Sequence, residues 1–152
     1  MLSVIIDVAR REDRLPGLLA ALTPAAVEGL VKEVLVVGSA GSEPLDALCE
    51  DTGAEQAGSL REAIGRAKAD LLLVLPPEIR FANGWVERLN DHLAAGGRTA
   101  VLEGERAGGL FGGRPYGVLI QKSAAADLVE PDIQALRRKL GGGGVGGGKR
   151  LR

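Results

Sequence analysis

The sequence predicts a three-layer α/β domain, in which helices cover both faces of a mostly parallel central sheet. The first observation behind this prediction is an alternation: short apolar runs rich in β-branched residues or leucine are followed by segments whose apolar residues have helical spacing. The second is size and composition, since the chain has 152 residues, of which 45% are hydrophobic and 26% are charged. A chain of this kind is typical of one soluble globular domain.

Strands and helices alternate in the first half of the chain. The run from Leu2 to Val8 is apolar and β-branched, as in a strand buried on both faces. Thr23-Pro24 is typical of an N-cap and a first-turn proline, so it should open a second short helix after the first. Gly53 should end a third helix. The expected strands are 2–8, 34–37 and, at an edge, 54–57, and the expected helices are 13–22, 23–29 and 44–51.

The second half continues the alternation. Ser59 and Glu62 form a capping box, which predicts a helix to about residue 69. Pro76-Pro77 stops the most apolar run of the chain. Three further helices should open at Asn83, Ser123 and Pro131, the last one reaching Leu140. The expected strands are 70–75, 98–105 and 116–121, with a Gly-rich loop at 107–114.

Charge and residue usage exclude several classes of protein. The formal net charge is −1, whereas a domain that binds nucleic acid is usually clearly basic, so nucleic acid is not an expected partner. Cys49 is the sole cysteine, which excludes an intrachain disulfide and favours a cytoplasmic location. His92 is the sole histidine, which excludes a His-rich zinc site. We expect neither a transmembrane helix nor a signal peptide.

The positive charge gathers at the end of the chain. Residues 137–152 carry six basic side chains and no acid, and seven of the eight residues from Gly141 to Gly148 are glycine. Such a segment cannot recover its backbone entropy by packing side chains. We therefore expect a domain over residues 1–140 and a flexible, Gly-rich basic tail over 141–152. The tail serves solubility in one interpretation, and contacts an anionic surface, such as a peripheral membrane, in the other.

Ligands of such sheets bind at the carboxyl ends of the strands, near the point where the strand order reverses. The positions to inspect are therefore 7–10, 38–42 and 76–80. The small residues at 38–42 either let backbone N–H groups approach a phosphate or form an ordinary turn. Glu78 either holds a divalent cation or is solvated. Asp132 is favoured by the dipole of the helix it begins.

The sole histidine and the sole cysteine of the chain are both expected to have structural roles rather than functional ones. His92 lies in the middle of a predicted helix near charged residues, so we expect it at the surface. Cys49 falls on the apolar face of a helix, so we expect it to fill the core.

The order of several motifs resembles the family 2 glycosyltransferases of GT-A fold, especially a small bacterial branch. That branch reads S-V-I-I-P-T, then E-V-I-V-V-D-G-G-S-x-D, then L-L-F-L-H-A-D-T and P-G-W. The matching segments here are 3–6, 31–39, 69–75 and 83–85. The similarity covers about residues 2 to 90. It resumes at residues 114–117, similar to a P-Y-G-D-Q-G segment, and at 131–138, similar to E-D-x-D-x-x-R-R.

This resemblance implies a GT-A-like fold and an inverting transfer of a sugar from a nucleotide-diphosphate sugar to a hydroxyl. It assigns Asp132 as the catalytic base and Glu78 as a weak ligand for Mn²⁺ or Mg²⁺. The nucleotide-binding positions that it implies are Asp7, Val8, Arg10, Gly38, Ser39 and Glu78.

The chain departs from the family at the residues that carry the chemistry. Gly38 stands where the family has the aspartate that contacts the base of the nucleotide, and Pro76-Pro77-Glu78 stands where it has the D-x-D metal motif. Asp7-Val8 replaces a Pro-Thr pair, and Pro131 replaces the acid before Asp132. Three arginines near the strand ends offer positive charge in place of a metal: Arg10, Arg11 and Arg80.

Three functions therefore stay open. The first is a glycosyltransferase-like enzyme, and the second is a relative that has lost catalysis and serves as a binding or assembly module. The third is a generic nucleotide-binding α/β domain. The donor sugar, the acceptor and the oligomeric state are not fixed by the sequence, and fold analogy alone does not establish activity.

Overall fold

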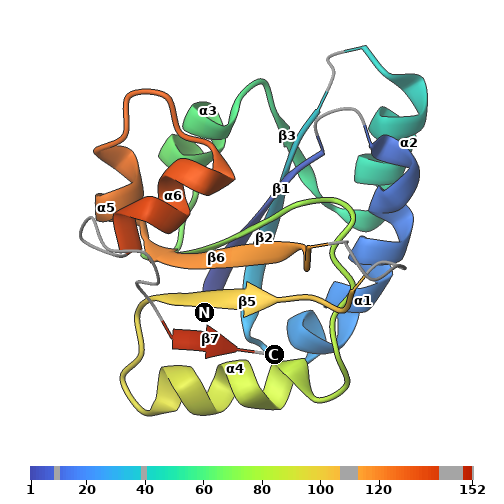
Figure 1. The fold of residues 1–152 in the computed structure, drawn as a ribbon. Coiled ribbons are helices and arrows are strands. Elements are labelled where there is room, and N and C mark those ends of the chain that lie inside the picture. Colours follow the sequence, from blue (N-terminus) through green and yellow to red (C-terminus); the bar gives the residue numbers. More distant parts are fainter. Residues whose placement is uncertain (9–10, 39–40, 107–112, 141–148, 152) are drawn as a thin grey trace.

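The computed structural model describes residues 1–8, 11–38, 41–106, 113–140 and 149–151. These residues form one mixed β-sheet with helices on both sides (Figure 1). The strands are β1 (Leu2–Asp7), β2 (Val31–Val37), β3 (Glu55–Ala57), β4 (Leu71–Leu75), β5 (Ala100–Glu103), β6 (Tyr116–Gln121) and β7 (Lys149–Leu151). The helices are a short 3-10 turn η1 (Glu12–Arg14), α1 (Leu15–Val27), α2 (Glu43–Thr52), α3 (Leu60–Arg66), α4 (Trp85–Ala94), α5 (Lys122–Ala126) and α6 (Ile133–Leu140).

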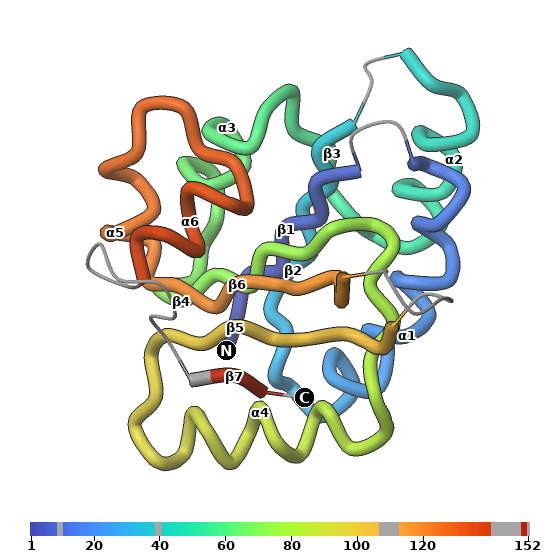
Figure 2. Tube along the Cα trace, in the orientation of Figure 1, coloured from blue at the N-terminus to red at the C-terminus, as the bar shows by residue number. Residues whose placement is uncertain are grey.

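The strand order is β3-β2-β1-β4-β6-β5-β7. β1 pairs in parallel with β2 and β4, β2 with β3, and β5 with β7. β6 is antiparallel to both of its neighbours, so it alone of the described strands runs the other way. The predicted mostly parallel sheet is therefore confirmed, and the chain trace in Figure 2 shows its path.

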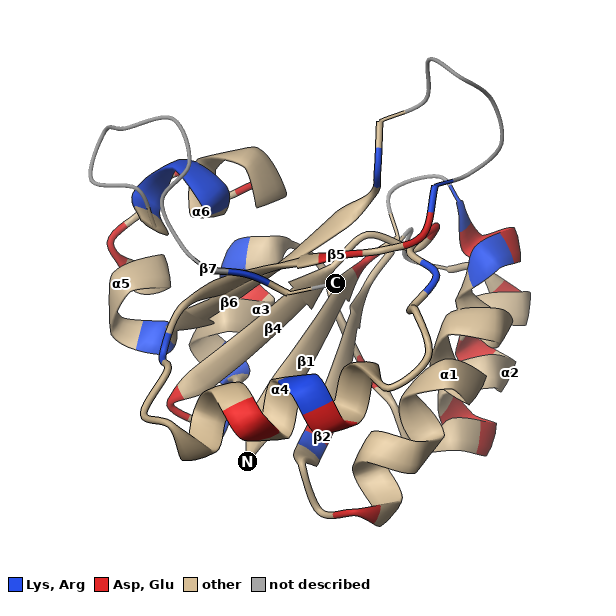
Figure 3. Cartoon of the chain, turned by 60° about the horizontal axis from the view of Figure 1, so that its bottom comes forward, with Lys and Arg blue, Asp and Glu red and all other residues tan. Residues whose placement is uncertain are grey.

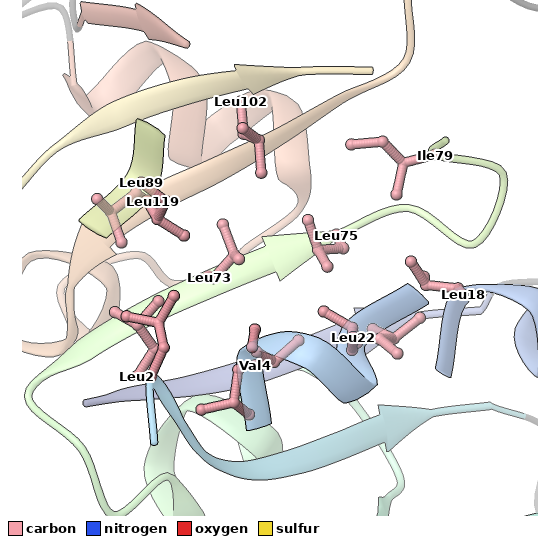
Figure 4. Packing of buried hydrophobic residues seen from close by; sticks show 14 of the residues in the cluster. Leu2, Val4, Leu18, Leu22, Leu73, Leu75, Ile79, Leu89, Leu102 and Leu119 are labelled. Carbon is pink, nitrogen blue, oxygen red and sulfur yellow. The ribbon is translucent and has the colours of Figure 1, made fainter. Parts of the chain in front are cut away.

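Two apolar clusters hold the three layers together. One joins the sheet to α1, α2 and α4, and the other joins it to α3, α5 and α6. Figure 4 shows part of the first cluster, where Leu73 and Leu75 of β4 face Leu22 of α1 and Leu102 of β5. β1 and β4 are covered on both faces, which explains why their sequences are continuously apolar rather than alternating.

A polar contact pins the amino ends of the central strands. Ser3 is fully buried, and its hydroxyl donates to Glu33 Oε1, which also accepts from the backbone N–H of Lys68. The Ser3 hydroxyl in turn accepts from the N–H of Ala69, at 3.0 Å. Burial works to raise the pKa of Glu33, but these hydrogen bonds and nearby lysines lower it overall. The contact joins the amino ends of β1, β2 and β4, whereas the predicted ligand site lies at the carboxyl ends of these strands.

The predicted break at Thr23-Pro24 is wrong, since α1 is one continuous helix with Pro24 inside it. The hydroxyl of Thr23 donates to the carbonyl of Leu19, one turn earlier, instead of capping a new helix. Pro24 is exposed, whereas Leu22 and Ala25 on either side of it are buried. Burial of this apolar face therefore outweighs the one backbone hydrogen bond that proline removes.

Other expected helix starts shift by one or two residues. Gly84, with φ of +76°, is the N-cap of α4 in place of Asn83, and Gln121 is the N-cap of α5 in place of Ser123. The capping box holds in a modified form, because Ser59 accepts from the N–H of Glu62 while Glu62 accepts from the N–H of Gly58.

The prediction that His92 lies at the surface is wrong. It is 9% exposed instead of lying at the surface, and its Nε2 lies 3.0 Å from the carbonyl oxygen of Thr99. That nitrogen therefore donates to the carbonyl and holds the end of α4 against the chain that enters β5. Cys49 fills the core as expected, at 4% exposure.

The expectation of a free tail over 141–152 is wrong for its last described residues. Lys149–Leu151 form β7, which adds to β5 at the edge of the sheet, and Leu151 is buried. One apolar side chain and an open strand edge are enough to order this segment, although it has no helical or strand periodicity. Residues 141–148 and Arg152 lie outside the described residues. Within the described part of the chain, no helix has the length and apolarity to span a membrane.

Candidate functional site

The order of the strands reverses between β1 and β4. The chain moves from β1 outward to β3 on one side and then returns across the sheet to β4 on the other. Ile6 is opposite both Val36 and Leu75, so β1, β2 and β4 end at one level. In open α/β sheets this is the edge at which ligands bind. Because β6 is antiparallel, its first residue, Tyr116, lies toward the same edge.

The ends of β1 and β2 are joined by hydrogen bonds. The N–H of Val8 donates to the carbonyl of Val37 at 2.8 Å, and the Ser42 hydroxyl donates to Glu12 Oε2 at 2.8 Å. Val8 is fully buried and Asp7 is half-buried. The structure thus brings Asp7, Val8 and the end of β2 together, as predicted. The predicted residues Arg10 and Ser39 lie outside the described residues.

Gly38 occupies the position at which the resemblance expects an aspartate. A Cβ added to Gly38 would lie 2.7 Å from Cδ2 of Leu45 and 3.9 Å from Cβ of Val8. Leu45 is a buried core residue of α2, at 2% exposure. The space that an acidic side chain would enter is therefore filled by leucine, and this edge offers no carboxylate at position 38.

The loop after β4 is fixed against the end of β5. A Cβ on Gly104 would lie 2.7 Å from Cγ1 of Ile79 and 2.9 Å from the carbonyl oxygen of Arg80, so only glycine fits there. The N–H of Glu105 donates to that carbonyl at 2.7 Å. Ile79 is buried by this contact, whereas its neighbours Glu78 and Arg80 are exposed.

Glu78 and Arg80 line a groove of about 460 Å³ between α1 and the loop after β4. Charges of both signs surround it, and the charged residues are Asp13, Arg14, Glu78, Arg80 and Glu105. Figure 3 shows acidic and basic segments at this end of the molecule, near the start of α1.

Two of the arginines near this groove have an acidic neighbour. Asp13 lies 3.8 Å from Arg11 and 3.5 Å from Arg14, which are exposed ion pairs of small energetic weight. Arg80 is exposed at the end of the β4 loop. Of the arginines near the strand ends, Arg14 and Arg80 line this groove, and Arg11 pairs with Asp13 beside it. Arg10 lies outside the described residues.

The predicted metal position has few ligands. Glu78 follows two prolines, which supply no side-chain oxygen. Across the described ranges, no group of three or more His, Cys, Asp or Glu side chains is arranged to hold a metal ion. Hard divalent cations take six or more oxygen ligands, so these residues do not fit a protein-made metal site.

Asp132 is the N-cap of α6. Its Oδ1 accepts from the backbone N–H of Ala135 at 2.7 Å, and its carbonyl accepts from the N–H of Leu136 at 2.9 Å. The carboxylate is exposed and sits where the helix dipole favours a negative charge. The structural interpretation of Asp132 is therefore confirmed, and a catalytic role stays a prediction.

An arginine–aromatic contact joins α6 to the strand edge. The guanidinium carbon of Arg137 lies 4.4 Å from the centre of the Tyr116 ring, within the range of a cation–π interaction. Both residues belong to the two late segments that resemble the family motifs, but they are far apart in sequence. The motif order was the available signal, and it did not predict their contact.

A second, larger groove lies away from the strand ends. It measures about 540 Å³ and runs between α1 and α2, lined mainly by apolar residues together with Lys32 and Glu33 at the amino end of β2. Ligands of such sheets bind at the carboxyl ends of the strands, so this groove, at the amino end of β2, is not the site that the topology predicts.

The comparisons with known proteins show a structural likeness. No protein-family model and no curated protein sequence matches the chain. It is similar to glucosyl-3-phosphoglycerate synthase from Mycobacterium tuberculosis, solved in complex with Mn²⁺, uridine diphosphate and glucosyl-3-phosphoglycerate. The TM-score is 0.60 at 14% identity, over 84% of this chain and 59% of that chain. A complex of the same synthase with Mn²⁺, UDP-glucose and phosphoglyceric acid gives a TM-score of 0.59 at 15% identity.

A related enzyme gives a weaker likeness. Mannosyl-3-phosphoglycerate synthase from Rubrobacter xylanophilus has a TM-score of 0.52 at 13% identity, over 67% of this chain and 38% of that chain. At such identities the likeness shows the fold alone. The predicted GT-A-like α/β fold is therefore confirmed. The chain spans about three fifths of the length of the first of these relatives.

Proposed function

We propose that the edge formed by the ends of β1, β2 and β4 binds a nucleotide-diphosphate sugar, and that the chain is a glycosyltransferase-like protein. The observation that carries the proposal is the superposition of 84% of this chain on a synthase whose complex contains uridine diphosphate. The reversal of strand order between β1 and β4 supports the same edge on physical grounds.

In a transfer reaction of this class, an acceptor hydroxyl loses its proton to a base while its oxygen attacks the anomeric carbon. The bond from that carbon to the diphosphate breaks, and the nucleoside diphosphate leaves with the electron pair. We assign the base to Asp132, whose exposed carboxylate has one oxygen bonded to its own helix. Its second oxygen is the one with which it would accept the proton.

The residues after β4 do not supply the ligands of a metal site. The synthase is solved with Mn²⁺, but here Glu78 is the one acid that follows β4 directly, and the described residues do not fit a metal site. We assign the leaving diphosphate to the positive charge of Arg11, Arg14 and Arg80.

A second candidate function is a binding or assembly module without catalysis. It is favoured by the filled space at Gly38 and by the missing acids at Pro76-Pro77. Both functions use the same edge, and they differ in whether the donor sugar is transferred.

A thermal-shift screen of nucleoside diphosphates and their sugars tests the proposal. We expect a raised melting temperature with at least one of them, in EDTA as well as in Mn²⁺, because binding to the native state stabilises it. The R80A variant should lose this shift, whereas V27A, at an α1 residue that is 81% exposed, should keep it. A panel without any shift at millimolar ligand contradicts nucleotide binding at this edge.

A further inference from the structure

α1 lies at the surface of the domain, yet none of its 13 residues is charged. Its inner face is buried through Leu18 and Leu22, whereas Pro16, Ala20 and Val27 are exposed. A helix at the surface of a soluble domain usually carries charged residues on the face turned to solvent, and a helix that is apolar all round is usually covered on every side. The composition of α1 is therefore that of a helix whose outer face is covered as well.

The groove between α1 and α2 is longer than its first hollow of about 540 Å³. A second hollow of about 560 Å³ lies toward the amino ends of both helices, and the two hollows share Pro16 and Leu48. Leu19, Val34 and Leu48 are partly buried and form an apolar floor. The lining runs along α1 from Pro16 to Ala26, a length of about 15 Å, or about three helical turns. The two hollows therefore form one apolar groove that is long enough for a short helix.

The charge around this groove is mainly negative. Residues 12–54, the stretch that contains every lining residue, include eight acidic and two basic residues, whereas the whole chain has a net charge of −1. The charged residues of the second hollow are Glu12, Asp13 and Asp51, while one basic residue, Lys32, lines the groove at its other end. Asp51 is exposed and forms no ion pair within the described ranges. Figure 3 shows α1 without charged residues beside acidic segments of α2. The groove therefore attracts a ligand that carries positive charge beside an apolar surface.

We propose that the groove between α1 and α2 is a docking site for an amphipathic helix of a partner protein, one whose apolar face is flanked by lysine or arginine. Apolar residues three and four positions apart on such a helix fill a groove between two helices. The flanking cations then lie against the acids of the second hollow, with Asp51 as the one that has no ion pair within the described residues. This interaction does not depend on nucleotide binding, because the first hollow lies at the amino end of β2.

Two other occupants match the charge of the groove less well. A second copy of the chain brings the same acids, so a symmetric pair through this groove sets like charges against one another. An anionic lipid surface is repelled by the same acids. Of these three occupants, the helix with basic flanks alone matches both the apolar floor and the acidic rim.

Fluorescence anisotropy on the full chain tests the docking site with a synthetic probe. The probe is a labelled helical peptide of about five turns, with leucine on one face and lysine on the other. Its control is a peptide of the same composition in shuffled order, which should bind about tenfold more weakly or worse because it has no continuous apolar face. A20R adds bulk and positive charge to the groove and should weaken binding of the probe by about tenfold or more. The matched control A94R, at an exposed residue of α4, should bind like the unmodified chain.

The acidic rim has its own pair of variants. D51N should weaken binding of the probe by about threefold, because the peptide then meets one charge fewer. D91N removes an exposed acid from α4, away from the groove, and should leave the affinity unchanged. Equal losses in the two variants would mean that the probe responds to net charge alone, which overturns the docking site.

Unchanged binding in A20R, or equal binding of the two peptides, also overturns the docking site. If A20R does not fold, as judged from its melting curve, A20Q and A94Q replace the two arginine variants and the same criteria apply. If the unmodified chain binds vesicles of phosphatidylcholine and phosphatidylserine but not the probe, the groove faces a membrane and the helical partner is overturned. A dimer in sedimentation that A20R dissociates overturns it in favour of a second copy.

Discussion

Cδ2 of Leu45 stands 2.7 Å from the point where a Cβ on Gly38 would lie. This relationship decides what the end of β2 can do. A carboxylate introduced at position 38 meets a buried leucine of α2 rather than a ligand, so a nucleotide held at this edge must be bound by other groups. Backbone N–H groups and arginines are the donors that the edge offers.

The G38D variant should therefore be destabilised, by about 1–3 kcal/mol, because the new side chain forces Leu45 from its place. Removing the obstacle in G38D/L45A should cost less than the sum of the two single changes, since the leucine is then absent. Urea denaturation of the four proteins of the cycle measures this coupling. Additive effects would contradict the contact between position 38 and Leu45.

Asp132 can be tested in its two roles separately. D132N keeps an N-cap side chain and should leave stability nearly unchanged, whereas D132A should lose about 1 kcal/mol because the N–H of Ala135 loses its acceptor. If the chain transfers sugar, both variants should lose about 10²–10⁴-fold in rate. If D132N transfers sugar at an unchanged rate, Asp132 is not the base, and its role is to cap α6.

Glu33 makes stability depend on pH. Its pKa in the folded state lies below its ordinary value of 4.5, since the hydrogen bonds from Ser3 and Lys68 outweigh the effect of burial. The folded state thus binds the proton less readily than the unfolded chain does. The resulting stabilisation is present above pH 4.5 and is lost as the pH falls through the lowered value.

The E33Q variant should have a flatter dependence of the unfolding free energy on pH below 4.5 than the unmodified chain. Denaturant melts at a series of pH values measure it. The matched control is V27A, at an exposed residue of α1, which removes no titrating group and should keep the unmodified slope. Equal slopes in E33Q and the unmodified chain would show that the contact with Ser3 does not act on folding.

Cys49 should be unreactive in the native protein. Burial, with a smaller effect from Asp46, raises the pKa of its thiol, and the thiolate is the reactive form. We expect a thiol reagent at pH 8 to modify Cys49 only after denaturant unfolds the chain. Rapid modification without denaturant would mean that α2 opens locally. Hydrogen exchange of the amides of α2 would then locate the opening.

The sequence predicts the layers well because they depend on local patterns. The strand at 116–121 has the predicted bounds, and Gly53 closes α2 with φ of +74°, the conformation that favours glycine. The prediction at Pro24 was wrong because proline usually ends or begins a helix, whereas here the burial of one face of α1 keeps the helix continuous. β7 and His92 were missed for a related reason: Leu151 and the Thr99 carbonyl become partners only when the sheet has formed.

The sequence likewise predicts some parts of the candidate site and not others. The strand ends that form it follow from the alternation of strands and helices, and the cap at Asp132 follows from its place before a helix. The filling of position 38 by Leu45, the groove beside Glu78 and the contact of Arg137 with Tyr116 depend on how α2, the β4 loop and α6 pack. No pattern within one segment carries that information.

Calorimetric titration of the full chain with UDP-glucose, in EDTA and again in Mn²⁺, tests the central claim most directly. We expect saturable binding in EDTA, little change with Mn²⁺, and the same affinity in E78Q, because arginines rather than a metal face the diphosphate. A tight site that appears only with Mn²⁺ and is lost in E78Q contradicts the assignment of the metal position. No binding of UDP-glucose under either condition contradicts a nucleotide-sugar site at the ends of β1, β2 and β4.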